Sequence, residues 1–143
     1  MMHHKLKEEQ REEGFTLIEL LVVVIIIGIL AAIAIPVFLN QRESAWISST
    51  ETDIRNAAMQ VETCYTRDRA YPAADEWGPG PVVVPDLCED GSGDVAVSED
   101  VTLNYEPGGE TFTITGSHLN VNEDAPIATY NSETGGLSGE GEE

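Results

Sequence analysis

The hydrophobic residues of this chain first gather in one uncharged run from Leu20 to Leu39. At about 1.5 Å of rise per residue, such a run forms a helix of about 30 Å, the thickness of the hydrocarbon layer of a membrane. We therefore predict a hydrophobic transmembrane helix over residues 15–40. Gly28 and Pro36 are its weak points, because glycine disfavours a helix interior and proline lacks an N–H donor.

The helix is expected to continue beyond the membrane. Residues 41–68 contain neither proline nor glycine, and apolar side chains recur there at helical spacing on one face: Ile47, Ile54, Ala58, Val61 and Tyr65. Polar residues occupy the other faces. We predict that residues 41–69 form an amphipathic helix that carries a small soluble head.

The remaining residues favour turns and β-structure. Residues 70–94 are rich in proline, glycine and acids, which predicts a long loop in which Trp77 is a packing anchor. Short alternating runs over residues 95–134 predict an antiparallel sheet, with a hairpin of residues 101–106 and 111–115 around Pro107-Gly108-Gly109. Residues 135–143 are expected to form an acidic flexible tail. The predicted fold is α+β, with a small sheet packed on the second half of one long helix.

The charge of the chain is strongly negative. Its 143 residues contain 7 Lys and Arg against 26 Asp and Glu, a formal net charge of −19, and no basic residue follows Arg69 apart from a histidine. Direct nucleic-acid binding is not expected, because phosphate contacts need a cationic surface. The acids indicate a solvated, self-repelling surface, or an adaptation to high salt or divalent cations; their spacing does not decide between these readings.

Two cysteines, Cys64 and Cys88, are expected to form a disulfide if the head is exported, since an even pair in a small domain is typical of an oxidising compartment. Two free thiols, or half of a metal site, are the alternatives. The bond would pin the 70–94 loop to the end of the helix. Four acids of this loop are weak candidates for Ca²⁺, without the spacing of an EF-hand: Asp86, Glu89, Asp90 and Asp94. We expect no other cofactor.

One carboxylate, Glu19, stands immediately before the uncharged run. At the membrane boundary it is costly unless a cation meets it. Cleavage at the conspicuous junction Gly14–Phe15 would create an ammonium group on Phe15, about one helical turn away, and the two groups could pair between packed chains. Residues 1–14 carry Lys and Arg, which predicts a cytoplasmic amino-terminal side.

The segment GFTLIELLVVVIIIGILAAIAIP, residues 14–36, resembles the start of type IV pilins and pseudopilins. The resemblance rests on a glycine, then a phenylalanine, then a glutamate, all leading a long apolar helix. It implies that a prepilin peptidase removes the leader of residues 1–14 by cutting after Gly14 and methylates Phe15. It also implies that Glu19 neutralises the amino terminus of a neighbouring subunit, and that the helix extends locally between Gly28 and Pro36 in the filament.

The sequence thus predicts a structural subunit of a type IV pilus, most like a major pilin, that serves adhesion, motility or DNA uptake. Its partners would be copies of itself, the prepilin peptidase and the inner-membrane assembly machinery. The precursor would span the cell membrane once, and the mature chain would lie in an extracellular pilus. The alternatives are the major pseudopilin of a type II secretion system and a monomeric, membrane-tethered acidic module that binds Ca²⁺. We identify no catalytic arrangement, and His118 is expected at the surface.

Overall fold

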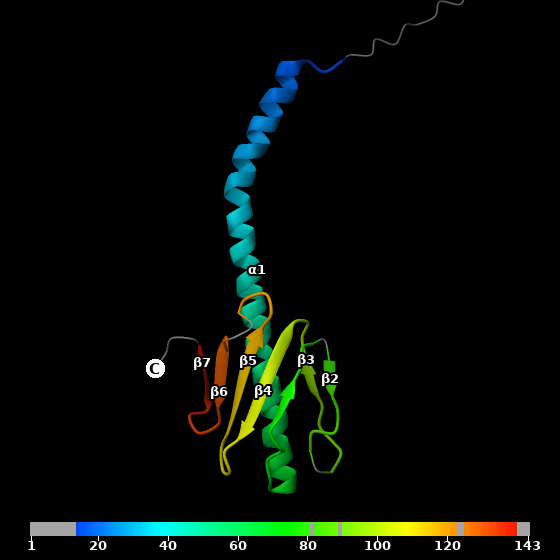
Figure 1. Ribbon diagram of the computed structural model, residues 1–143, viewed down its shortest axis with the longest axis vertical. Coiled ribbons are helices and arrows are strands. Elements are labelled where there is room, and N and C mark those ends of the chain that lie inside the picture. Colours follow the sequence, from blue (N-terminus) through cyan, green and yellow to red (C-terminus); the bar gives the residue numbers. More distant parts are fainter. Residues whose placement is uncertain (1–13, 81, 89, 123–124, 140–143) are drawn as a thin grey trace, which may run out of the picture. The chain divides into compact units, whose positions relative to one another are not determined.

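The computed structural model describes residues 14–80, 82–88, 90–122 and 125–139. The chain divides into two compact units, residues 1–38 and residues 39–143. One helix, α1 (Leu17–Asp68), contributes residues to both units (Figure 1). Residues 1–13 of the predicted leader lie outside the described part of the chain.

The first unit is formed by the apolar part of α1. Every large apolar side chain from Phe15 to Phe38 is exposed. The helix is long and apolar enough, by length and composition, to cross a membrane. Gly28 and Pro36 both lie inside α1, so neither residue ends the helix. The predicted long apolar helix is therefore confirmed.

The second unit adds seven strands to the remainder of α1. They are β1 (Asp75–Trp77), β2 (Val82–Val84), β3 (Val95–Val97), β4 (Val101–Pro107), β5 (Phe112–His118), β6 (Ala128–Asn131) and β7 (Gly136–Gly139). Five of them form an antiparallel sheet in the order β1-β4-β5-β6-β7, while β2 and β3 form a two-stranded antiparallel sheet. Figure 1 shows the larger sheet lying across the second half of the helix. The α+β fold is thereby confirmed.

The hairpin around Pro107-Gly108-Gly109 is present as β4 and β5. Pro107 faces Phe112 across the turn, and Val101 faces His118 at the far end. The turn closes through a 2.7 Å hydrogen bond from the Gly108 N–H to the carbonyl of Thr111. Alternation along both strands places one set of side chains toward α1, as the period of two requires.

The core lies between this inner face of the sheet and one face of α1. The buried apolar residues of the helix are Ile54, Ala57, Ala58, Val61 and Cys64, and the buried residues of β4 and β5 include Val101, Leu103, Tyr105, Phe112 and Ile114. Burial of each large apolar side chain contributes about 1.5–3 kcal/mol. Trp77 is 2% exposed and stacks on Tyr105 at 5.4 Å between ring centroids, so its predicted role as a packing anchor is confirmed.

Three sequence predictions for the head need correction. The segment 70–94 contains the strands β1 and β2, because the backbone of β1 pairs with β4 and that of β2 pairs with β3. The predicted flexible tail, 135–143, contains β7, which pairs with β6; residues 140–143 lie outside the described part. His118 is 3% exposed rather than at the surface, since it continues the inward alternation of β5.

Candidate functional site

The start of α1 is organised by Thr16 and Glu19. The Thr16 N–H and hydroxyl both donate to Oε2 of Glu19, at 2.9 and 2.7 Å, and the Glu19 N–H donates to the Thr16 hydroxyl at 3.3 Å. This reciprocal pattern is a capping box, in which the residue before the helix and the third helical residue satisfy each other's donors. The T-x-x-E spacing of these two residues is a signal in the sequence itself, but the predictions from sequence did not include a cap.

The capping box fixes where the Glu19 carboxylate lies. The carboxylate turns back toward the residue that follows Phe15, and both donors reach the same oxygen. Among the described residues, none donates to Oε1 of Glu19. A negative group at a helix amino terminus is also favoured by the helix dipole. The arrangement therefore presents one carboxylate oxygen close to the residue where the predicted cleavage would create an ammonium group.

Apolar side chains surround this carboxylate. A shallow hollow on the helix surface is lined by Phe15, Ile18, Glu19, Val22 and Val23. Phe15 is 84% exposed and Ile18 is 67% exposed. Gly14 has open space where a side chain would be, and both residues of the Gly14–Phe15 bond are exposed. The structure thus brings Gly14, Phe15 and Glu19 together at one exposed helix start, while their roles in processing and assembly stay predictions.

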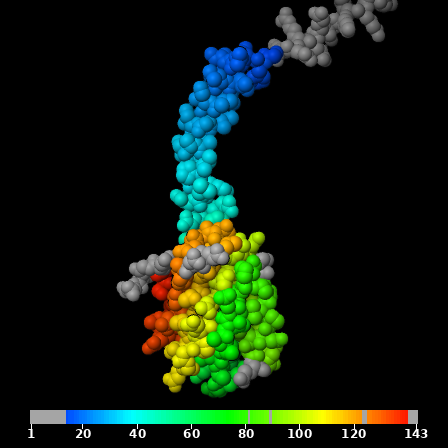
Figure 2. All heavy atoms as spheres, in the orientation of Figure 1, coloured from blue at the N-terminus to red at the C-terminus, as the bar shows by residue number. Residues whose placement is uncertain are grey.

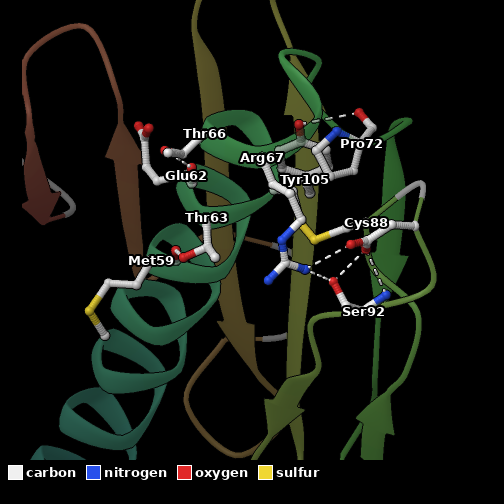
Figure 3. The surroundings of a disulfide bond; sticks show 11 residues. Met59, Glu62, Thr63, Thr66, Arg67, Pro72, Cys88, Ser92 and Tyr105 are labelled. Atoms are coloured by element: carbon white, nitrogen blue, oxygen red, sulfur yellow. Dashed lines mark hydrogen bonds and ion pairs between the residues drawn. A yellow bond between two sulfur atoms is a disulfide. The ribbon is translucent and has the colours of Figure 1, made fainter.

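The other sequence-predicted pair, Cys64 and Cys88, is joined as a disulfide (Figure 3). The loop is also held by Arg67, whose guanidinium donates to the Ser92 hydroxyl and to Asp90 at 3.0 Å. Backbone bonds from Cys88 to Ser92 and from Leu87 to Gly93 close the loop on itself. A disulfide and a side-chain clamp therefore fasten the same loop to the last turns of α1.

Three of the four acids proposed for Ca²⁺, Asp86, Asp90 and Asp94, are among the described residues of this loop. Asp90 interacts with Arg67, and the Ser92 hydroxyl together with that guanidinium holds the pKa of Asp90 below its usual value. Asp68, Cys88 and Asp90 place ligand-type atoms within 4.8 Å of one another, but the Cys88 sulfur is part of the disulfide and is no thiolate. Glu89 lies outside the described residues. A calcium site here stays a prediction.

Two buried polar groups of the head were not predicted from the sequence. Asp53, 6% exposed, accepts hydrogen bonds from the N–H and hydroxyl of Ser98. His118 packs against the Trp46 ring at 5.4 Å between centroids, and its Nδ1 accepts the Asn120 N–H at 3.1 Å. Both groups have partners inside the head, so they serve the fold and leave the exposed helix start as the candidate site.

Comparison with known proteins bears on this site directly. The family model described as the prokaryotic N-terminal methylation motif matches residues 10–35, which include Gly14, Phe15 and Glu19. The type IV narrow pilus major component PilA5 of Thermus thermophilus is 34% identical over 111 residues, 73% of this chain and 87% of that protein. This chain belongs to the type IV pilin and pseudopilin family. Its predicted family is thereby confirmed.

Other relatives match shorter parts of the chain. The type II secretion system core protein G of Pseudomonas aeruginosa is 33% identical over 69 residues, 48% of this chain and 49% of that protein. The type IV major fimbrial protein FimA of Dichelobacter nodosus is 47% identical over 53 residues, 37% of this chain and 34% of that protein. The match thus spans half or less of these two relatives. No solved structure matches the chain.

Proposed function

We propose that this chain is a structural subunit of a type IV pilus, built into the filament through its apolar helix. The similarity to the pilus component PilA5 carries the proposal, because it covers 87% of that protein and 73% of this chain, and so must include part of the head. The similarity to the secretion protein covers only half of that protein. A pilus is therefore favoured over a secretion pseudopilus, and the role is structural rather than enzymatic.

The exposed apolar side chains of α1 supply the driving force for assembly. An apolar surface of this length, with every large side chain from Phe15 to Phe38 exposed, is stable only in lipid or against other apolar helices. The precursor would span the membrane with residues 1–14 on the cytoplasmic side, and the extracellular filament would then bury the same side chains between subunits. The prepilin peptidase and the assembly machinery of the inner membrane would be its other partners.

Glu19 would set the register of each new subunit. After cleavage, the Phe15 ammonium group of one chain and the Glu19 carboxylate of its neighbour carry opposite charges in an apolar environment. Such a pair is worth far more there than in water, and an unpaired charge is costly. A subunit that arrives out of register would leave both charges unpaired, which disfavours the wrong arrangement.

Two measurements test this proposal: whether surface filaments contain this chain, and whether their assembly needs the charge of Glu19. Filaments sheared from cells should contain this chain, and mass spectrometry should find N-methylated Phe15 as its first residue. Glu19→Gln is the decisive variant, because glutamine can still complete the capping box but carries no charge. We expect it to be cleaved and to remain in the membrane without forming filaments.

The matched control is Glu43→Gln, which removes an exposed carboxylate further along the same helix. It should form filaments normally. Normal filaments from Glu19→Gln would refute the register role of the charge. Filaments that lack this chain, or a chain that starts elsewhere than Phe15, would refute the proposed function and favour a membrane-tethered monomer.

A further inference from the structure

The second unit carries far more negative than positive charge. Residues 39–143 contain 21 Asp and Glu against 4 Arg, and no Lys. Exposed carboxylates lie on several elements of the head, among them Glu62 on α1, Glu76 on β1 and Glu106 on β4. Figure 2 shows the face of the head that the strands cover. Any arrangement that brings two such heads together therefore brings like charges together.

The four arginines of the head provide few positive groups that could pair with the acids of a neighbouring head. Arg55 pairs with Glu51 of the same helix at 3.8 Å, and Arg67 pairs with Asp90 at 3.0 Å. The guanidinium of Arg42 lies 4.8 Å from the centre of the Trp46 ring. Three of the four arginines thus already have a partner within their own subunit. Salt bridges between heads would have to compete with these contacts.

We propose that dissolved cations control assembly of the filament by screening repulsion between the heads. This inference rests on the proposed function, since it needs subunits that assemble through their apolar helices. The helices attract one another and the heads repel one another, so the ionic strength sets the balance. The cations that act here are those dissolved around the heads, rather than an ion bound at a specific site.

The physical range of the repulsion matches the size of the head. The Debye length is about 30 Å at 0.01 M salt and about 3 Å at 1 M. A compact domain of about 100 residues has a radius of gyration of about 13 Å. At low salt, each head therefore repels its neighbours across its whole width. At high salt, only charges in near contact still interact.

The experiment uses filaments isolated from cells and dialysed into NaCl between about 0.01 M and 1 M, a range over which the Debye length falls about tenfold. After sedimentation, the fraction of chain in the pellet is measured by quantitative immunoblotting, and filament length by electron microscopy. We expect the pelleted fraction to fall severalfold toward low salt. A constant fraction, or one that falls as salt rises, would overturn the inference.

A charge-reduced variant tests whether the heads cause this dependence. Four exposed acids that are not part of α1 are replaced together: Glu99→Gln, Glu106→Gln, Glu110→Gln and Glu133→Gln. The salt concentration at which half of the chain pellets should fall by about twofold or more, because repulsion grows with the product of the head charges. The matched control replaces the same four residues by aspartate and should leave that concentration unchanged.

Divalent cations distinguish screening by dissolved ions from binding of an ion at a specific site. MgCl₂ and CaCl₂ should each restore pelleting at much lower concentration than NaCl, and equally well, because screening depends on ionic charge rather than identity. Restoration by Ca²⁺ alone would overturn screening in favour of a bound ion. A chain that forms no filaments at any salt concentration would refute the proposed function, whereas filaments indifferent to salt would refute only this inference.

Discussion

The Asp53 carboxylate on α1 accepts two hydrogen bonds from Ser98, 45 residues further along the chain: 2.7 Å from the backbone N–H and 3.1 Å from the hydroxyl. Ser98 stands between β3, in the small sheet, and β4, in the large sheet. A single buried side chain of the helix therefore holds the turn that connects the two sheets. Because Asp53 is 6% exposed, water can replace little of this interaction.

Asp53→Ala should lower the free energy of unfolding by about 1–3 kcal/mol, since it leaves the Ser98 N–H without its acceptor. Asp53→Asn should cost less, because the side-chain carbonyl can still accept one bond. Thermal unfolding followed by circular dichroism in detergent measures both. Glu62→Ala, an exposed acid on the same helix, serves as the control and should change little. Equal melting temperatures for Asp53→Ala and the unmodified chain would show that other contacts hold the turn.

Gly116 on β5 lies where an added side chain would collide with residues of α1. A Cβ atom at this position would lie 2.7 Å from Cγ2 of Thr50 and 2.8 Å from Cδ1 of Ile54. Gly116→Ala should therefore destabilise the head by about 1–3 kcal/mol, the usual cost of overpacking a core. The control is Gly136→Ala on β7, where a Cβ meets nothing within 4 Å. An equally small effect at both positions would mean that the helix can move away from the sheet at little cost.

Much of this fold could be predicted from the sequence because its signals are local. The uncharged run and the apolar period before Asp68 specified α1, and alternation around Pro107-Gly108-Gly109 specified the β4–β5 hairpin. The prediction of a loop over residues 70–94 was wrong about its strands, because Pro and Gly are typical of loops. The strand β1 is stabilised by pairing with β4, about 30 residues away along the chain. The strand β7, with the sequence GLSG, has little strand preference of its own and depends on its backbone bonds to β6.

The candidate site could also be predicted because its signals are local in the sequence. A lone carboxylate beside an apolar run is costly, so Glu19 stood out from its position alone. The cap formed by Thr16 had a readable signal in the T-x-x-E spacing. His118 also had one, because it shares the inward face of β5 with Phe112 and Ile114. The Asp53–Ser98 pair had no signal in the sequence, since nothing around either residue indicates a partner so distant along the chain.

The disulfide should supply a large part of the stability of the head. Cys64 and Cys88 are 24 residues apart, and closing a loop of this length contributes about 3–4 kcal/mol in the chain-entropy account. The double variant Cys64→Ser/Cys88→Ser should lose most of this amount in thermal or urea unfolding. The unmodified chain in reducing agent should lose a similar amount, and the double variant should not respond to the reductant. Unchanged stability in both samples would mean that the Arg67 clamp alone holds the loop.

Two tyrosines of the aromatic core make the head sensitive to alkaline pH. Burial raises the pKa of Tyr105 to about 12, and burial together with the Glu62 carboxylate raises the pKa of Tyr71. In the unfolded chain, a tyrosine loses its proton near pH 10. Between about pH 10 and 12 the unfolded state therefore binds fewer protons than the folded state, so the free energy of unfolding falls as pH rises through this window. Below it, these tyrosines contribute no pH dependence.

The variant Tyr105→Phe tests this assignment, because it removes the ionisable group and keeps the ring that stacks on Trp77. At pH 8 the variant should be less stable by about 1 kcal/mol, since the Tyr105 hydroxyl no longer donates to the Pro72 carbonyl. Its midpoint in urea should nevertheless fall less steeply above about pH 10 than that of the unmodified chain, with Tyr71 responsible for part of the remaining slope. Identical slopes for the two proteins would show that the Tyr105 phenol is not the group that resists ionisation in the folded state.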